Sequence, residues 1–323
     1  MNFFHISTKT RKKQPCYLRF LPVCGTVAHG DIMKKQIKSS LFLLSGTVIW
    51  GAAFVAQRSG MAHIGPFTFQ AIRCGLGCAF LLLLSLFTGN RQSAAAGWRS
   101  RQLWLAGILC GSALFVAAGL QQVGLQYTAA GKAGFLTAMY IVIVPLKDLF
   151  TRKRLPLTLW ISVAMSVGGL YLLSCVGITE INPGDLLLAG CAVAFALQIL
   201  LIDRFAPGLD AIKFNALQSG VCAALSAVLM VFESPTVSGI TAAWLPLCYA
   251  GVLSTGVAYT FQIIGQRNLH PAVASLIMSM ESVFAALSGW LLLREQMSTP
   301  ELWGCALVFG AVLLSQVPAK KIP

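Results

Sequence analysis

The stretch PAVASLIMSMESVFAALSGWLLL, residues 271–293, contains a single charged side chain, that of Glu281. A helix needs about 20 mostly apolar residues to cross the hydrocarbon core of a bilayer, and this stretch is long enough. Pro271 at its first position suits the first turn of a helix, where its missing N–H has no helical partner to lose. The stretch therefore predicts a membrane-spanning helix with one carboxylate near its middle.

The rest of the chain follows the same pattern. The length criterion finds nine further apolar stretches, at 39–57, 67–87, 103–123, 129–146, 155–175, 185–202, 211–232, 242–265 and 300–317. Composition agrees, because 57% of the 323 residues are hydrophobic and only 11% are charged, against about 25% charged in soluble domains. We therefore expect an all-α integral membrane protein with ten transmembrane helices.

The basic side chains indicate how the helices are oriented. The net charge is +14, but it lies in short segments between apolar stretches and forms no continuous basic face, which argues against nucleic acid as a partner. With the N-terminus in the cytoplasm, twenty of the 24 Lys and Arg residues lie inside and three lie outside. This bias predicts a multi-pass protein of the cytoplasmic membrane with both termini cytoplasmic.

The two halves of the chain resemble each other. A shift of 145 residues aligns Phe69, Gly75 and Phe87 with Phe214, Gly220 and Phe232, and a shift of 141 aligns Val116, Gln121 and Gly124 with Val257, Gln262 and Gly265. Because each half holds five spans, the second half must enter the membrane from the opposite side. We therefore expect two inverted five-helix repeats, at 33–176 and 177–323, with a substrate site between them near the membrane midplane.

Residues 1–32 differ from the rest of the chain. They contain Lys9, Arg11, Lys12, Lys13 and Arg19, and no apolar run long enough to span a bilayer. They also lack the cleavage pattern of a secretory signal peptide. Met33, followed by two lysines and an apolar run, resembles the start of an inner-membrane protein. We expect translation to start there, which would leave residues 1–32 untranslated. A basic cytoplasmic tail is the alternative.

Cysteine and histidine patterns predict no metal site and no cofactor. Most of the ten cysteines lie in apolar runs, where a free thiol packs as a small hydrophobe, and no CxxC pair occurs. The four histidines lie outside the spans or at their ends. The GxxxxGK[ST] pattern of ATP-binding loops is absent as well.

Several motifs along the chain carry a family resemblance. They are Ile49-Trp50-Gly51-Ala52-Ala53-Phe54-Val55, Pro66 with Ala71-Ile72-Arg73, the run 130–137 continuing to Val144-Pro145, and Glu281 through Gly289-Trp290-Leu291-Leu292-Leu293-Arg294-Glu295. In this order the motifs resemble those of EamA-type members of the drug/metabolite transporter superfamily. Arg294 replaces a usual Gly, and Ser282 stands where the family often has Pro. The resemblance covers residues 34–317 and implies a ten-helix carrier built from two EamA repeats.

Charged side chains within the spans are candidate site residues, because a charge at bilayer depth costs roughly 2.5–3.5 kcal/mol on insertion scales. Glu281 is interpreted as a ligand for an amine or cation, or as a proton carrier. Arg73, in the second span, is interpreted as a ligand for an anionic group. The structural alternative is that these two side chains pair with each other.

Amide and aromatic side chains complete the candidate site. Seven glutamines lie in apolar spans, and Gln121 and Gln262 occupy equivalent positions in the two halves. Trp50, Tyr140 and Tyr259 are interpreted as the aromatic lining of a cavity for a cation or a planar ligand. Hydrogen bonding between helices and ordinary packing are the alternative roles of these residues.

The expected function is secondary active transport. We expect a carrier that moves a small metabolite (an amino acid, an amine or a related compound) or a drug-like solute by alternating access. Its partners are the lipid bilayer, the substrate and H⁺ or Na⁺ as a coupling ion, unless the substrate's own gradient supplies the energy. Whether the carrier forms a homodimer stays open. The alternatives are a channel-like or structural membrane subunit and a membrane-embedded enzyme; enzymatic activity is not expected, because no clustered acid–base set is present in the spans.

Overall fold

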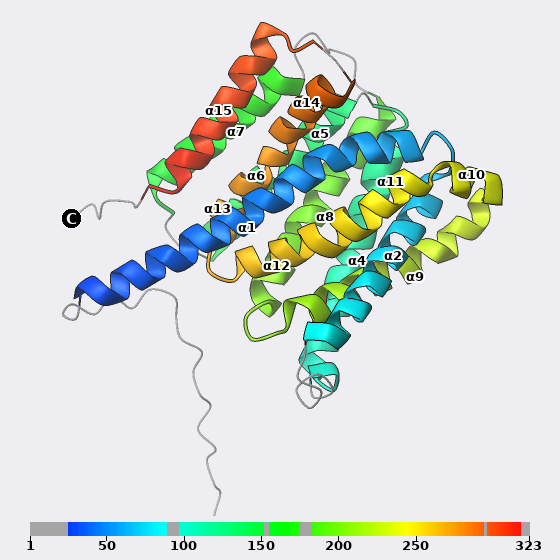
Figure 1. Ribbon diagram of the computed structural model, residues 1–323. Helices are drawn as coiled ribbons and strands as arrows, with labels where there is room; N and C mark the ends of the chain where they lie inside the picture. Colours follow the sequence, from blue (N-terminus) through cyan, green and yellow to red (C-terminus); the bar gives the residue numbers. More distant parts are fainter. Residues whose placement is uncertain are drawn as a thin grey trace, which may run out of the picture.

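The computed structural model describes residues 25–88, 97–128, 130–151, 155–174, 182–293 and 296–317, and within these ranges every regular element is a helix (Figure 1). The elements are α1 (Gly25–Gly60), α2 (Pro66–Thr88), α4 (Arg101–Gly124), α5 (Ala130–Ala138), α6 (Tyr140–Phe150), α7 (Leu157–Ser174), α8 (Pro183–Phe205), α9 (Ala211–Met230), the 3-10 helix η1 (Val231–Glu233), α10 (Val237–Ala242), α11 (Trp244–Cys248), the π-helix η2 (Tyr249–Ala258), α12 (Tyr259–Gln266), α13 (Pro271–Met278), α14 (Met280–Leu293) and α15 (Thr299–Ser315).

The expectation of an all-α membrane protein is confirmed. Over the ranges just given, nine helices or runs of consecutive helices are long and apolar enough to cross a membrane, and α15 is a further apolar helix of 17 residues. The expected first span, 39–57, lies within α1, which extends beyond it at both ends and begins at Gly25. The expected boundary between repeats at 176 and 177, most of the extension 1–32 and the motif residues Arg294 and Glu295 lie outside the described residues.

Local sequence explains where two of the helices begin. The side-chain oxygen of Asn182 accepts a hydrogen bond from the backbone N–H of Asp185, and the Asp185 carboxylate accepts one from the Asn182 backbone. Ser298 and Glu301 form the same reciprocal cap at α15. In both helices a proline occupies the first turn. These caps satisfy backbone donors that have no partner inside a helix.

Three of the spans are irregular near their middle. The fourth span is broken at Met139 between α5 and α6, and the ninth at Ser279 between α13 and α14. In the ninth span the Ser279 hydroxyl donates to the backbone carbonyl of Leu276 at 2.7 Å, a type of bond that bends helices. In the eighth span the α-helical pattern widens into the π-helix η2. Irregular backbone at membrane depth is expected only where it faces protein or a cavity.

Helices from the two halves of the chain pack against each other. Helix α2 lies along α9, α7 lies along α15, and α1 packs against α14 (Figure 1). Glycines allow close approach, because a Cβ on Gly51 would lie 2.5 Å from the Cβ of Phe284 on α14. In the same way, Gly107 and Gly111 on α4 let this helix approach α9. The small-residue spacing Gly107-xxx-Gly111 thus serves close contact between helices.

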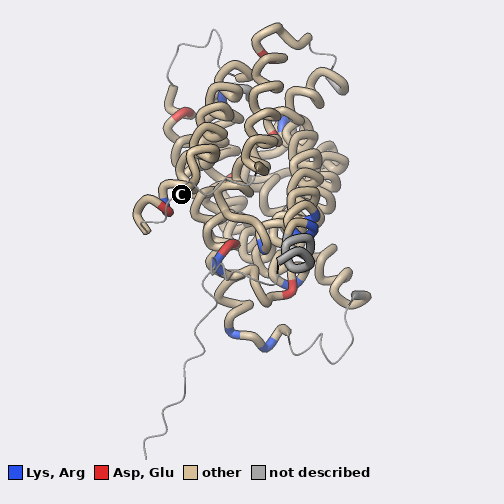
Figure 2. Tube along the Cα trace, turned by 90° about the vertical axis from the view of Figure 1, so that its left-hand side faces the viewer, with Lys and Arg blue, Asp and Glu red and all other residues tan. Residues whose placement is uncertain are grey.

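Most of the trace is uncharged (Figure 2), and two ion pairs hold the broken fourth span against α8. Lys132 Nζ on α5 lies 2.5 Å from an oxygen of Asp185, near the start of α8. Lys147 Nζ on α6 lies 3.7 Å from Asp203, near its end. The two pairs lie on either side of Tyr140, the first residue after the break. The two ion pairs therefore hold the fourth span against α8 on both sides of Tyr140.

Candidate functional site

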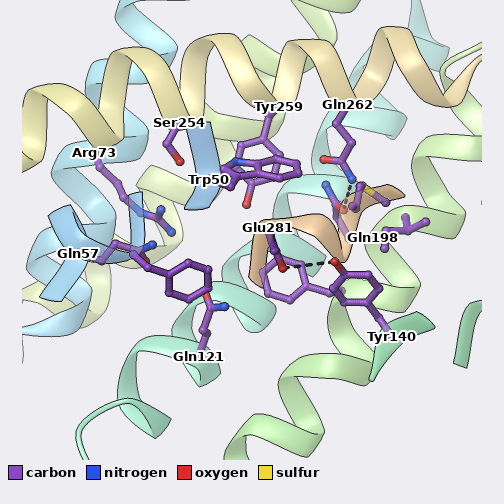
Figure 3. Close-up of a pocket in the computed structure, with 14 residues that line it drawn as sticks. Trp50, Gln57, Arg73, Gln121, Tyr140, Gln198, Ser254, Tyr259, Gln262 and Glu281 are labelled. Carbon is purple, nitrogen blue, oxygen red and sulfur yellow. Dashed lines mark hydrogen bonds between the residues drawn. The ribbon is translucent and has the colours of Figure 1, made fainter. Parts of the chain in front are cut away.

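A cavity lies among the helices of both halves (Figure 3). All seven residues that the sequence predicted for the site line it: Trp50, Arg73, Gln121, Tyr140, Tyr259, Gln262 and Glu281. They come from α1, α2, α4, α6, α12 and α14. The structure therefore brings together side chains that lie more than 200 residues apart in the sequence.

Glu281 and Tyr140 meet directly in this cavity. The Tyr140 hydroxyl donates a hydrogen bond to Glu281 Oε1 at 3.3 Å. Tyr140 is the first residue of α6, and Glu281 lies in the first turn of α14, so each follows the break in its span. The breaks thus place both polar groups at the cavity instead of in the packed bundle.

Arg73 is the second charged side chain of the cavity. It is only 4% exposed, and its Nε has no hydrogen-bond partner in the described part of the chain. The ion pairs formed by the described residues join other side chains, and none links Arg73 to Glu281. In Figure 3, Arg73 and Gln57 lie toward one side of the cavity, and Tyr140 and Gln262 toward the other. The alternative of a fixed Arg73–Glu281 pair is therefore not what this structure contains.

A chain of amides forms one wall. Gln262 Nε2 donates to Gln198 Oε1 at 3.2 Å, and Gln198 Nε2 donates to Gln218 Oε1 at 3.2 Å. Within the described part of the protein, Gln262 Oε1 is left without a donor, and Gln57 Oε1 lacks one as well. The wall therefore fixes the direction of the Gln262 amide and leaves its oxygen available.

Aromatic rings form part of the lining. The Trp50 indole packs edge-on against Tyr259, with ring centroids 5.0 Å apart. Its Nε1–H has no hydrogen-bond partner among the described residues. The ring pair is thus positioned by packing and leaves a free donor.

The unpartnered groups define what the cavity is able to bind. Two N–H donors of its lining, on Trp50 and Arg73, and two amide oxygens, on Gln57 and Gln262, have no partner among the residues that the structure describes. Buried polar groups in folded proteins are almost always hydrogen-bonded to protein, water or ligand. The lining is therefore suited to a small polar molecule that carries both acceptors and donors. Across the described residues, no group of three His, Cys, Asp or Glu side chains could hold a metal ion.

Seven further lining residues were not among the predicted ones: Phe54, Gln57, Phe195, Gln198, Ile199, Ser254 and Met278. Four of them could have been found from the 141-residue shift, which aligns Ala53-Phe54-Val55-Ala56-Gln57 with Ala194-Phe195-Ala196-Leu197-Gln198. The same shift relates Gln121 to Gln262 and Tyr140 to Glu281. Eight of the fourteen lining residues thus form four pairs with one constant spacing.

Comparison with known proteins finds relatives that match most of the chain. An uncharacterized transporter of Archaeoglobus fulgidus is 28% identical over 286 residues, which cover 87% of this chain and 86% of that protein. The uncharacterized transporter YoaV of Bacillus subtilis is 24% identical over 87% of this chain and 97% of its own length. A protein of known crystal structure shares the fold with a TM-score of 0.73 at 21% identity, over 85% of this chain and 95% of that one.

The model of the EamA-like transporter family matches the chain twice, at residues 37–175 and 182–316. The two matches cover most of the 323 residues and include every residue that lines the cavity. Relatives of nearly the same length are likewise named as transporters. The chain therefore belongs to the EamA-like transporter family, within the drug/metabolite transporter superfamily, and is a multi-pass membrane transporter.

Proposed function

We propose that the chain is a secondary carrier for a small zwitterion, an amino acid or a closely related compound, and that the cavity of Figure 3 is its substrate site. The observation that carries this proposal is the separation of the two charged lining residues. Arg73 and Glu281 share one cavity without pairing with each other. A ligand with both an anionic and a cationic end would satisfy both side chains at once.

The chemistry of each end supports this assignment. The guanidinium of Arg73 offers a fork of N–H donors that matches a carboxylate. The indole N–H of Trp50 is a further donor in the same lining. Glu281 offers a carboxylate to an ammonium group. The Trp50 and Tyr259 rings add faces that attract a cation. The amide oxygens of Gln57 and Gln262 can accept hydrogen bonds from further donors on the substrate.

The architecture supports two inverted five-helix repeats, which we propose as the basis of alternating access. The two family matches meet between residues 175 and 182. Helix contacts between the halves come in equivalent pairs. The third span packs on the sixth, and its counterpart, the eighth, packs on the first. The fourth span also packs on the sixth, and its counterpart, the ninth, packs on the first. In such repeats a rocking motion exposes a midplane site to each side in turn.

The charge distribution supports a cytoplasmic location for both termini, as the sequence predicts. No nucleotide-binding loop pattern occurs in the sequence, and this favours an ion gradient or the substrate's own gradient as the energy source. Glu281 is the residue through which coupling to H⁺ would operate, because a carboxylate can exchange a proton for the substrate's ammonium group. Coupling to Na⁺ would use the same charge.

Transport by the purified protein in lipid vesicles tests the proposal. Each amino acid is compared with two analogues, an amine that lacks the carboxylate and an acid that lacks the amino group. The parent should transport the zwitterion and discriminate against both analogues. The Arg73→Gln variant should no longer prefer the zwitterion over the amine. The Glu281→Gln variant should no longer prefer the zwitterion over the acid. Each loss should be about 10- to 100-fold, since hydrogen bonds to charged groups contribute about 1.5–3 kcal/mol.

The crossed design supplies its own control, because each variant should keep its discrimination against the other analogue. A parent protein that accepts the amine as well as the zwitterion would show that Arg73 does not bind a carboxylate. If no zwitterion is transported with or without imposed pH and sodium gradients, the substrate class is wrong.

A further inference from the structure

Two thiols meet where α2 packs along α9, outside the lining of the cavity. The Cys74 and Cys222 sulfur atoms lie 3.5 Å apart, with Cys74 as the hydrogen-bond donor. Cys74 is 1% exposed and Cys222 is fully buried. Neither residue lines the cavity described above, so the proposed transport function makes no use of this contact.

The surroundings hold the two sulfurs in place. Gln70, one turn before Cys74 on α2, donates from Nε2 to Cys222 Sγ at 3.4 Å and to the backbone carbonyl of Phe115 at 3.2 Å. Among the seven cysteines that the structure describes, this is the one contact between two thiols. The contact therefore belongs to an ordered interface formed by α2, α4 and α9.

We propose that Cys74 and Cys222 form a redox modification site, at which a peroxide joins them as a disulfide. One thiolate attacks the O–O bond of the peroxide and becomes a sulfenic acid, and hydroxide leaves and takes up the thiol proton as water. The second thiol then attacks the sulfenic sulfur, the S–S bond forms and a second water leaves. The two thiols lose two electrons in total and the peroxide gains them. A disulfide needs the sulfurs at about 2.05 Å, so they must approach by roughly 1.5 Å.

The position of the bond determines its effect. Cys74 belongs to the first family match and Cys222 to the second, so the disulfide fastens one half of the chain to the other. A rocking motion of the halves requires α2 and α9 to move past each other. The bond should therefore arrest transport reversibly. This consequence rests on the proposed function, whereas formation of the bond does not.

Cross-linking in lipid vesicles tests the site. One variant keeps Cys74 and Cys222, with alanine at the other eight cysteine positions and a protease site inserted between residues 177 and 178. After hydrogen peroxide treatment and cleavage, its two fragments should migrate as one band on a non-reducing gel and separate after reduction. The matched control keeps Cys78 and Cys222. Cys78 lies one turn further along α2 and faces Gly220 on α9, so its fragments should separate without reduction.

The gel tests the site independently of any transported substrate. Separate fragments in the first variant, with both thiols reactive after unfolding, would overturn the proposal. Equal cross-linking in the control would also overturn it, because it would show unspecific contact between the two helices. Transport should fall in proportion to the cross-linked fraction and return on reduction, whereas Cys74→Ala in the parent should make transport insensitive to peroxide. Cross-linked protein that transports at the parental rate would refute the arrest.

Discussion

At the scale of single residues, Glu281 combines two properties that a purely structural acid would not need. Its carboxylate accepts one hydrogen bond, from Tyr140, in a cavity whose other charge, Arg73, lies apart from it. An ionised carboxylate has room for about four donors. Its remaining acceptor capacity is therefore available to a ligand, which makes Glu281 the residue whose charge should matter most for transport.

Glu281→Gln should abolish at least 90% of transport while the amount of protein in the membrane stays normal. The amide keeps the shape of the side chain and can still accept from Tyr140, but a charge-assisted bond of about 1.5–3 kcal/mol to the substrate is lost. Uptake into vesicles and quantification of the folded protein measure the two quantities. The control is Glu301→Gln at the exposed cap of α15, which should transport normally. Parental transport by Glu281→Gln would contradict the assignment.

At the scale of elements, the start of α2 is held by a carboxylate from the other half of the chain. Glu233 Oε1 accepts from the backbone N–H of Phe67 at 2.9 Å, and Oε2 accepts from the N–H and the hydroxyl of Thr68 at 2.7 and 2.6 Å. A negative charge at a helix N-terminus satisfies free N–H groups and interacts favourably with the helix dipole. Since α2 carries Arg73, this cap also helps to position the Arg73 side chain in the cavity.

Glu233→Ala should lower the free energy of unfolding by about 1–3 kcal/mol, because it leaves partly buried N–H groups without their acceptor. It should also weaken substrate affinity through the displacement of Arg73. Thermal unfolding in detergent and the KM of uptake measure these effects. Asp210→Ala is the matched control, since Asp210 caps α9 only locally, through the N–H of Lys213. A loss of stability no greater than that of Asp210→Ala would show that the long-range cap is dispensable.

The π-helix η2 depends on a side chain from α9. Asn215 Nδ2 lies 2.9 Å from the Thr255 carbonyl, 3.0 Å from the Gly256 carbonyl and 3.0 Å from the Thr260 hydroxyl. In a π-helix the backbone bonds span five residues instead of four, and such segments are frequent at functional sites. Tyr259 and Gln262 follow η2 directly, so the bonds of Asn215 help to set the position of both lining residues.

Asn215→Leu should destabilise the protein by about 1–3 kcal/mol, because the Thr255 carbonyl loses its side-chain donor, and should raise the KM of uptake. The Gly256 carbonyl keeps the Thr260 hydroxyl as a donor. Melting temperature and transport kinetics measure the change. Ser226→Ala, which removes a 2.7 Å bond within α9, should have a much smaller effect on both. Unchanged KM in a stable Asn215→Leu protein would mean that η2 is held by packing alone.

At the scale of the whole molecule, the sequence predicts helix positions well because twenty apolar residues in a row are an unambiguous signal. For example, the expected span 67–87 corresponds to α2, from Pro66 to Thr88. The extent of α1 was not predicted, since hydropathy marks the part of a helix that lipid can cover and not where the helix begins. The breaks at Met139 and Ser279 were missed as well. Neither residue is a helix breaker, and the irregularity depends on contacts that residue types alone do not reveal.

The candidate site was predicted from the cost of burying polar groups, and that argument selects some residues better than others. A charge such as Arg73 in an apolar span is conspicuous. Phe195 and Met278 are ordinary apolar residues of such spans, so only tertiary contacts show that they line the cavity. Gln57 and Gln198 lay among seven candidate amides, and the 141-residue spacing would have separated them from those that only join helices, such as Gln218.

The proposed orientation can be tested on the whole chain. A reporter fused at Pro183 should lie outside the cell and one fused after Lys321 inside it, because twenty basic residues favour the cytoplasmic side and three the other. Enzymatic reporters that are active on only one side of the membrane measure each position. The reverse pattern would contradict the orientation, whereas two reporters on one side would contradict an odd number of spans between them and with it the inverted repeats.

The contact between Tyr140 and Glu281 joins two positions with the 141-residue spacing. Under the proposed two-repeat arrangement, each therefore faces its own counterpart across the axis of symmetry. A dimer of two identical five-helix chains would have to place the same residue on both sides of that axis. Two glutamates at this distance would share one proton, and two tyrosines would carry no charge. Only a fused chain, whose two copies are free to diverge, can place a carboxylate opposite a phenol hydroxyl that donates to it.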